Sequence, residues 1–267
     1  VMSLFQNTSA LGIKPEDIGG TKLGALGIPE FGTDFAMQML MDTKPQYFSD
    51  LVRIAGLAHG TDVWLGNAQT LIKEGKATIS TAICTRDDIM IYLIQKGLDS
   101  EESFKIMEMV RKGKVASGKC KEWPEWKQDM IDHGVPDWYI WSCERIKYMF
   151  PKAHAAAYVM MAWRVAYCKV FYPLAYYTAY FSIRATAFDY EKMAMSPVRL
   201  EHYIAEYKAK KAEGTISNTE EDELGVMRIV QEMHARGYEF TPIDIYKAKA
   251  RTFQIICLLY TSPSPRD

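Results

Sequence analysis

Two prolines enclose the longest apolar stretch of the chain and restrict what it can form. Residues 152–172, between Pro151 and Pro173, are rich in alanine and aromatic side chains and carry few charges. Proline fits the first turn of a helix, disfavours helical geometry in the residue before it and breaks a helix interior. The sequence therefore predicts a helix ending at about Met149, a second one beginning at Pro151, and a kink or a new start at Pro173.

Helix start and stop signals recur along most of the chain. Thr or Asp precedes periodic apolar residues at several positions, with an acid three residues later, and glycine follows the last periodic residue. Short extended pieces are expected only near residues 23–28 and 237–246. The predicted fold is mostly α, a helical lobe with a few short strands. The predicted helices are 61–75, 85–97, 99–113, 137–149, 151–172, 197–214 and 219–237.

Charge and cysteine content exclude several classes of protein. The 32 basic and 33 acidic residues nearly cancel, so only local charge can indicate a partner. The 5 cysteines are scattered singly, which predicts neither a zinc site nor a disulfide framework and fits a reducing cytoplasm. No uncharged run reaches the ~20 residues that a membrane helix needs, and we expect no signal peptide. We expect no membrane partner.

Segment 145–154 gathers positive charge around the predicted start of a helix. Arg145, Lys147 and Lys152 occur without an intervening acid, and His154 follows. The first helical turn has free N–H groups and the positive end of the helix dipole, so cations are unfavourable there unless an anion shares the site. A phosphate would satisfy both the N–H groups and the side chains. The alternative is an ordinary proline-initiated helix whose lysine points into water.

Three other stretches suggest binding, and each has a structural alternative. Residues 111–121 hold five basic and no acidic side chains, which suits contact with a nucleic-acid backbone or a solvated loop after a helix. Residues 56–64, GLAHGTDVW, suit a floor beneath a small molecule or a tight turn. In CTRDDIM, residues 84–90, Arg86 is a candidate phosphate ligand, and helix capping explains the two acids better than a metal site does.

Common catalytic motifs are missing from the sequence. It contains no GxxxxGK[ST], GxGxxG, HExxH or GxSxG, and no acid pair suited to two-metal chemistry. We therefore assign no catalytic and no metal-binding residue. On its residues alone, the chain binds an anion more plausibly than it catalyses a reaction.

Long blocks of the sequence resemble a known family, the alpha subunit of bacterial DNA polymerase III in its Gram-positive, PolC type. The resemblance is carried by GIPEFGT, FSDLVRIAGLAHGTDVWLGNAQ, CTRDDIMIYLIQKGL, FKIMEMVRKGK and VPDWYIWSCERIKYMFPKAHAAAYVMMAWRVAYCKVFYPLAYY. It runs with few gaps over residues 1–256. It implies that residues 1–185 form the fingers region, which closes over the incoming nucleotide. Residues 186–256 would be a helical extension toward a helix-hairpin-helix DNA-binding domain.

The resemblance also implies which residues bind the nucleotide. Phe150 would pack near its base or sugar. The positions that would line the pocket are Ala58, His59, Gly60 and Thr61, and Ala58 stands where the family usually has a serine.

Further residues would contact phosphates or DNA. Tyr158 follows His154 by four residues and shares its helix face. Residues 115–134 are longer than the corresponding family loop, which leaves the path of this segment open. The candidate contacts are Arg86, Arg111, Lys112, Lys114, Lys147, Lys152, His154 and Tyr158.

For a complete protein, the resemblance implies a replicative DNA-directed DNA polymerase, a nucleotidyltransferase that uses Mg²⁺, dNTPs and primer-template DNA. The aspartates that bind Mg²⁺ and the 3′–5′ exonuclease domain would precede Val1, so the chain alone is expected to be inactive. Replisome components, including the sliding clamp, would be partners in the bacterial cytoplasm. The alternatives are a non-enzymatic helical nucleic-acid-binding module and a helical scaffold with a solvated basic loop.

The last eleven residues, CLLYTSPSPRD (257–267), differ from the rest of the chain. They resemble the translation of a transposon-type sequencing adapter, and the alternative is a Ser/Pro-rich tail. We expect the coding DNA of these residues to match the adapter.

Overall fold

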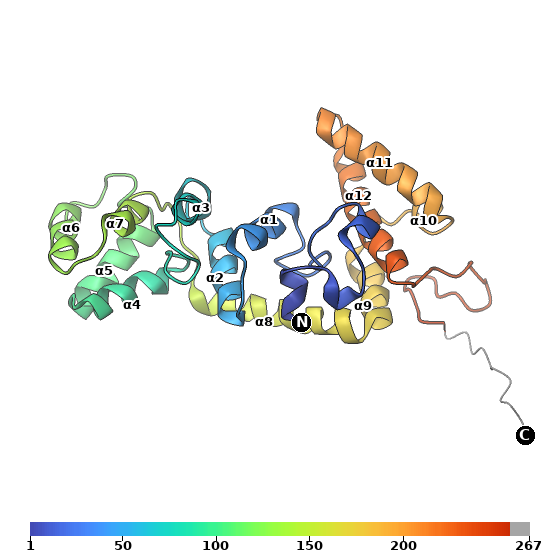
Figure 1. Cartoon of the computed structure of the whole chain (residues 1–267), viewed down its shortest axis with the longest axis horizontal. Coiled ribbons are helices and arrows are strands. Elements are labelled where there is room, and N and C mark those ends of the chain that lie inside the picture. Colours follow the sequence, from blue (N-terminus) through green and yellow to red (C-terminus); the bar gives the residue numbers. More distant parts are fainter. Residues whose placement is uncertain (257–267) are drawn as a thin grey trace, which may run out of the picture. The chain divides into compact units, whose positions relative to one another are not determined.

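The computed structural model describes residues 1–256, which fold as helices joined by loops (Figure 1). They form two compact units: Val1–Asn7 with Leu23–Arg164, and Thr8–Lys22 with the chain from Val165 onward. The mostly α fold expected from the sequence is confirmed, and none of the described helices is long and apolar enough to cross a membrane. The boundary proposed at residue 185 stays a prediction. The suggested adapter translation, 257–267, lies outside the described residues.

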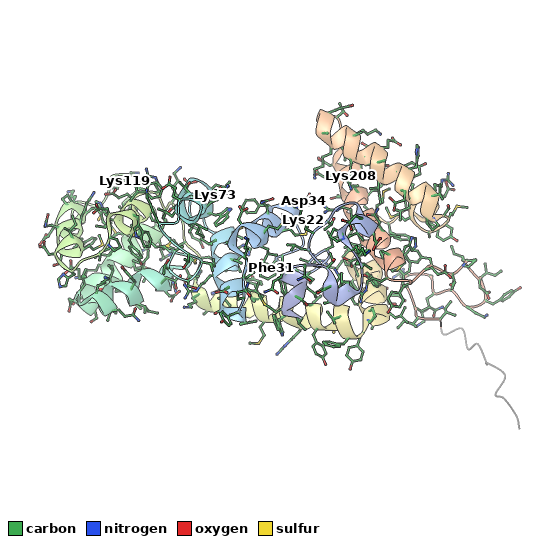
Figure 2. All side chains as sticks on the ribbon, in the orientation of Figure 1. Lys22, Phe31, Asp34, Lys73, Lys119 and Lys208 are labelled. Atoms are coloured by element: carbon green, nitrogen blue, oxygen red, sulfur yellow. The ribbon has the colours of Figure 1, made fainter. Side chains whose placement is uncertain are left out.

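The first unit is built from α1 to α7 and the N-terminal part of α8, with aromatic rings in its core. The rings of Phe5 and Phe31 pack edge to face with centroids 5.1 Å apart, and Phe31 is labelled in Figure 2. Phe48 packs on Trp163 of α8 at 5.6 Å. The elements are η1 (Met2–Phe5), α1 (Asp34–Thr43), α2 (Phe48–His59), η4 (Trp64–Ala68), α3 (Gln69–Lys73), α4 (Arg86–Lys96), α5 (Ser100–Arg111), α6 (Trp123–Asp132), α7 (Asp137–Cys143) and α8 (Lys152–Phe171).

Local signals fix the ends of α4 as the sequence predicts. The Asp88 carboxylate accepts the N–H of Thr85 at 2.8 Å, which satisfies a backbone donor at the start of the helix. Gly97 ends the helix with φ +101°, a left-handed conformation that glycine adopts readily. Likewise, Asp99 accepts two N–H groups at the start of α5.

The strands expected near residues 23–28 and 237–246 are wrong, because both segments form turns and irregular loops. Within residues 1–256, the extended pairing is limited to one isolated antiparallel bridge between Thr61 and Tyr148. Thr61 therefore does not cap a helix. The helix expected from it begins later, as α3, after the irregular turn η4.

The helix expected to run to Met149 ends earlier, because α7 stops at Cys143. The next helix begins at Lys152, immediately after Pro151, and ends before Pro173, as the two prolines predict. The residues between α7 and α8 use their backbone groups for bonds to distant segments, which a continued helix would not allow.

The second unit contains the C-terminal part of α8, a set of shorter helices and a helical hairpin formed by α11 and α12. The Lys169 ammonium on α8 lies 2.9 and 3.0 Å from the two carboxylate oxygens of Glu232 on α12, and both side chains are 0% exposed. Burial lowers the pKa of Lys169, and Glu232 opposes that shift. The elements are η2 (Ser9–Leu11), η3 (Pro15–Ile18), α9 (Pro173–Ala179), η5 (Tyr180–Arg184), α10 (Tyr190–Met193), α11 (Pro197–Glu213) and α12 (Asn218–Ala235).

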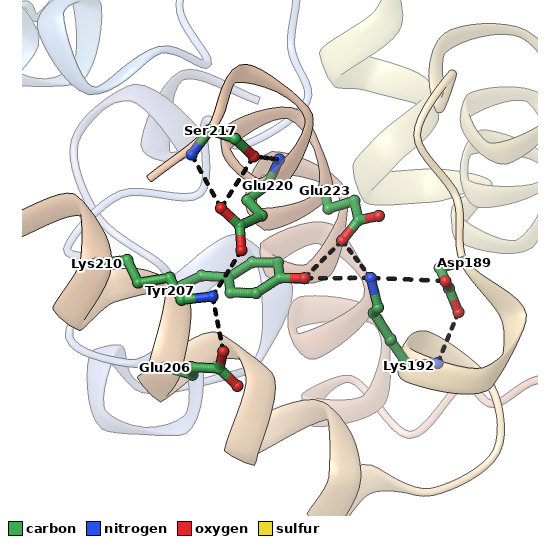
Figure 3. A network of polar contacts seen from close by, with 8 residues as sticks. All are labelled: Asp189, Lys192, Glu206, Tyr207, Lys210, Ser217, Glu220 and Glu223. Carbon is green, nitrogen blue, oxygen red and sulfur yellow. Dashed lines mark hydrogen bonds and ion pairs between the residues drawn. The ribbon is translucent and has the colours of Figure 1, made fainter. Parts of the chain in front are cut away.

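A polar network connects α10, α11 and α12 in the second unit (Figure 3). Lys192 donates to Glu223 at 2.7 Å and to the Tyr207 hydroxyl at 3.1 Å, and the Glu223 bond raises the pKa of the lysine. At the other end, Lys210 donates to Glu220 at 2.6 Å, which holds the pKa of this carboxyl at about 2. These bonds hold α10 and the turn between α11 and α12 in place.

Candidate functional site

Segment 147–150, between α7 and α8, joins three distant parts of the first unit through its backbone. The carbonyl of Tyr148 accepts the N–H of Thr61, just after α2, at 2.9 Å. The next residue donates its N–H to the carbonyl of Arg111, at the end of α5, at 3.3 Å. The last carbonyl of the segment accepts the N–H of Arg86, at the start of α4, at 3.2 Å. Candidate residues that are far apart in the sequence therefore surround one segment.

The start of α8 faces two carboxylates from the first turn of α4. The backbone N–H of Lys152 donates to Asp87 at 2.8 Å, and its ammonium lies 3.5 Å from Asp88. Asp88 also caps α4, as the sequence predicts. The side-chain Nε of Arg86 lies 3.9 Å from Asp87, beyond hydrogen-bonding distance. In this structure, the anion at the start of the helix is thus the carboxylate of Asp87.

The ion pairs around this segment are exposed enough to exchange partners. The side chain of Lys152 is 43% exposed and that of Asp88 14% exposed. Lys147 lies 2.8 Å from Asp62, and both side chains are largely exposed. Because an exposed pair is worth only about 0–1 kcal/mol, a phosphate could take either lysine from its carboxylate at little cost.

Aromatic rings gather beside the start of α8. The ring of Phe150 lies 4.8 Å from that of His59, 5.9 Å from that of His154 and 6.3 Å from that of Tyr158. His154 and Tyr158 therefore share the helix face that their spacing predicts. The His59 ring also contacts the Glu30 carboxylate, from a turn in which Glu30 has φ +71°. Rings and partly exposed polar atoms of this kind can stack on and orient a planar ligand.

The small residues of GLAHGTDVW approach the protein itself closely. A Cβ added to Gly56 would lie 2.8 Å from the carbonyl of Cys84, and one added to Gly60 would lie 3.0 Å from that of Tyr148. Ala58 is half-buried at the end of α2, and Thr61 follows in the isolated bridge. Close packing against the backbone thus explains why positions 56 and 60 are both glycine.

The basic end of α5 is partly neutralised by an acid on the same helix. Glu108 accepts from Arg111 at 2.9 Å and from Lys112 at 2.8 Å, and these bonds lower the pKa of Glu108 to about 2. Lys114 is exposed in the following turn. Gly113 packs against segment 147–150, since an added Cβ would lie 2.5 Å from the carbonyl oxygen of Lys147. Lys119, further along this basic loop, is exposed (Figure 2).

The sequence alone does not indicate which acids contact the candidate site. Glu108 could have been found from its spacing of three and four residues from Arg111 and Lys112. The others lie far from their partners in the sequence or outside any regular helix, so no periodic pattern reveals them. The acids are Glu30, Asp62, Asp87 and Glu108, opposite His59, Lys147, Lys152 and Arg111.

The described residues do not fit a metal ion. Residues 1–256 hold no group of three or more His, Cys, Asp or Glu side chains arranged to bind one. Asp87 and Asp88 are adjacent, but each already accepts hydrogen bonds from backbone N–H groups. No step of a reaction can be assigned to a metal bound by these residues.

Comparison with known proteins gives one consistent family. Residues 1–134, half of the chain, match the bacterial DNA polymerase III alpha subunit finger domain. The chain is 54% identical over 255 residues to a DNA polymerase III PolC-type of Streptococcus suis, and 51% identical over 254 residues to that of Caldanaerobacter subterraneus subsp. tengcongensis. It is 51% identical over 255 residues to that of Bacillus subtilis.

These alignments cover almost all of the chain but little of each relative. They include 95–96% of this chain and 17–18% of the relatives' own length. The described part of the sequence, with its helical fold, matches the relatives almost throughout. The chain therefore belongs to the PolC-type DNA polymerase III alpha subunit family and contains its finger domain.

Proposed function

We propose that this chain forms part of the surface of a replicative DNA-directed DNA polymerase that binds the incoming dNTP and primer-template DNA. The observation that carries the proposal is the convergence of four candidate phosphate ligands, Arg86, Lys147, Lys152 and His154, on and beside segment 147–150. The family assignment supplies the class of reaction, template-directed nucleotidyl transfer.

The chemistry of this reaction suits such a surface. Phosphoryl transfer depends mainly on positioning the triphosphate and neutralising its charge. In the proposed role, Lys152 and His154 hold phosphates at the start of α8, and Lys147 and Arg86 add positive charge nearby. The ring of Phe150 packs against the base or sugar, and the loop from Arg111 to Lys114 contacts the DNA backbone.

Other parts of the proposed polymerase must supply the remaining functions. Since residues 1–256 do not fit a metal ion, we propose that carboxylates elsewhere in the full-length protein bind Mg²⁺ and that this chain alone is inactive. The exonuclease activity, contacts with the sliding clamp and other replisome components, and action in the bacterial cytoplasm belong to the same proposal.

Primer extension by the full-length polymerase tests this function. Replacing Lys152 and His154 together by alanine should raise KM for dNTP or lower kcat, and each lost charged contact should cost about 1.5–3 kcal/mol. A Lys105→Ala variant, on the exposed face of α5, serves as the matched control. Unchanged kinetics with all four dNTPs would show that the motif is structural. DNA binding that weakens steeply with salt, without synthesis, would favour the non-enzymatic binding module.

A further inference from the structure

A loop of residues 241–252 extends away from the end of α12 within the second unit (Figure 1). Aromatic rings close its base, where the ring centroids of Phe240 and Phe253 lie 5.8 Å apart. The ring of Phe253 also lies 5.1 Å from that of Phe188, and its backbone N–H donates to the Ser182 hydroxyl at 2.9 Å. Both ends of the loop are therefore fixed to the body of the unit. We call residues 241–252 the C-terminal loop.

The tip of the C-terminal loop is a turn organised by Asp244. The carboxylate of Asp244 accepts the N–H of Tyr246 at 2.9 Å. Its backbone carbonyl accepts the N–H groups of Lys247 and Ala248 at 3.0 and 2.8 Å. The side chain of Gln254, which follows the loop, donates to the carbonyl of Lys247. Because base and tip are both held, the loop loses little conformational entropy when it binds a ligand.

The turn presents an aromatic ring and positive charge to water. Tyr246 is 93% exposed, and Ile245 beside it is 80% exposed. The ammonium of Lys247 lies 3.4 Å from the carboxylate that organises the turn, and its side chain is 69% exposed. Lys249 and Arg251 are also exposed, and neither has an ion-pair partner in the described part of the chain. These two cations are therefore available to a ligand.

The wider charge balance around the C-terminal loop is also positive. Residues 236–256 carry four basic and two acidic side chains. Residues 180–190, whose phenylalanines pack against the base of the loop, carry one arginine and one aspartate, which cancel. A polyanion is therefore attracted to the loop, whereas lysine is depleted at interfaces between proteins.

An exposed ring beside cations fits one kind of polyanion better than others. Proteins bind single-stranded nucleic acid by stacking its bases on aromatic rings and placing positive charge along its backbone. In a duplex the bases already stack on one another, so the ring would have no base to contact. The combination of Tyr246, Lys249 and Arg251 therefore favours an unpaired strand.

We propose that the C-terminal loop binds the single-stranded part of the template DNA. The ring of Tyr246 stacks on a base, and Lys249 and Arg251 contact phosphates. This site belongs to the second unit, whereas segment 147–150 belongs to the first. The inference rests on the proposed function in one respect, that the nucleic acid is the DNA of a polymerase.

Binding of two DNA probes to the full-length polymerase tests the stacking contact. For a primer-template with a single-stranded overhang, Tyr246→Ala should raise Kd at least about fivefold, and Tyr246→Phe, which keeps the ring, less than about twofold. Neither variant should change Kd for a blunt duplex. Tyr47→Ala, at an exposed tyrosine of the first unit, is the matched control. Equal Kd values for the overhang with Tyr246→Ala and the wild type would overturn the proposal.

Salt dependence tests the cations. Replacing Lys249 and Arg251 together by alanine removes two phosphate contacts, so the slope of log Kd against log salt for the overhang should fall by about 1.4. Lys105→Ala should leave the slope as it is in the wild type. An unchanged slope in the double variant would overturn the proposed site, because its cations would then not contact phosphates.

Photo-crosslinking identifies the ligand. With Tyr246→p-benzoylphenylalanine in the full-length polymerase, we expect a crosslink to the single-stranded overhang. A crosslink to protein would overturn the proposal in favour of a protein interface. A crosslink to the duplex alone would overturn it in favour of a contact with paired DNA.

Primer extension by the same preparations separates this inference from the proposed function. An active polymerase whose affinity for the overhang does not depend on Tyr246 contradicts only the loop site. A protein that binds the overhang through Tyr246 but adds no nucleotide contradicts only the polymerase function.

Discussion

The lysines at the two ends of α8 differ in how far their ion pairs are exposed to water. At its first residue, Lys152 faces Asp88 across 3.5 Å and remains 43% exposed. Near its last turn, Lys169 contacts Glu232 at 2.9 Å with no exposure at all. Water weakens the first pair, so Lys152 can exchange Asp88 for another anion. Lys169 is closed off from water and from any anion other than Glu232. The same residue type therefore suits ligand binding at one end of the helix and fixed structure at the other.

The largest expected effect comes from breaking the buried pair. Lys169→Ala leaves Glu232 charged and without its partner in the interior, so we expect a loss of about 3–5 kcal/mol in the free energy of unfolding. Urea denaturation measures the loss. Lys105→Ala, which removes an exposed partner of Glu101, should change stability by less than about 0.5 kcal/mol.

A double variant separates charge from packing at the same place. Lys169→Met with Glu232→Leu removes both charges and fills similar volume, so it should recover much of the stability lost by Lys169→Ala. If the double variant is as unstable as the single one, losing the Tyr177 hydrogen bond to Glu232 outweighs removing the buried charge.

The exposed end makes a contrasting prediction about binding. Asp87 occupies the N–H of Lys152, so its carboxylate competes with a phosphate at the start of α8. In the full-length polymerase, Asp87→Asn should lower KM for dNTP by up to about tenfold, because a nearby negative charge is removed. Asp132→Asn, on α6, is the control. An increase in KM would show that Asp87 positions the site rather than competing for it.

A pH titration examines the basic end of α5. The pKa of Glu108 falls from 4.5 to about 2 because Arg111 and Lys112 bind its charged form. Its contribution to stability, about 1 kcal/mol, is therefore complete above pH 4.5 and is lost as the pH falls toward 2. The difference in unfolding free energy between the wild type and Glu108→Gln should shrink over that range. A difference independent of pH would rule out the ionised contact as its source.

The smallest effect is expected at Lys147. Its pair with Asp62 is exposed on both sides, so Lys147→Ala should change stability by less than about 0.5 kcal/mol. Thermal unfolding measures this change. A loss near that of Lys169→Ala would remove the distinction between the exposed and buried lysines.

Local sequence signals account for the parts of the fold that were predicted correctly. Thr85, Asp88 and Gly97 fix both ends of α4 through neighbouring atoms, and Pro173 separates α8 from α9. Residues 147–149 were predicted wrongly as helix because their backbone partners, such as Thr61, lie far away in the sequence. Lys169 looks like a break in an apolar stretch until its partner, 63 residues later, is known.

In the candidate site, too, features set by neighbouring residues were predictable and contacts between distant residues were not. Its cations were visible as clusters in the sequence, and the rings of His154 and Tyr158 lie on one helix face, as their spacing predicts. The opposing carboxylate of Asp87 lies 65 residues from Lys152. Only the fold places it at the start of α8, where it occupies the position expected for a phosphate.

The most direct test of a phosphate site at the start of α8 is equilibrium binding of dNTP to the full-length polymerase. Calorimetric titration at fixed ionic strength should give a Kd at least about tenfold higher for Lys152→Ala than for the wild type. Lys105→Ala should bind as the wild type does. Equal Kd values for all three proteins would contradict the site, and Lys152 would then serve only its pair with Asp88.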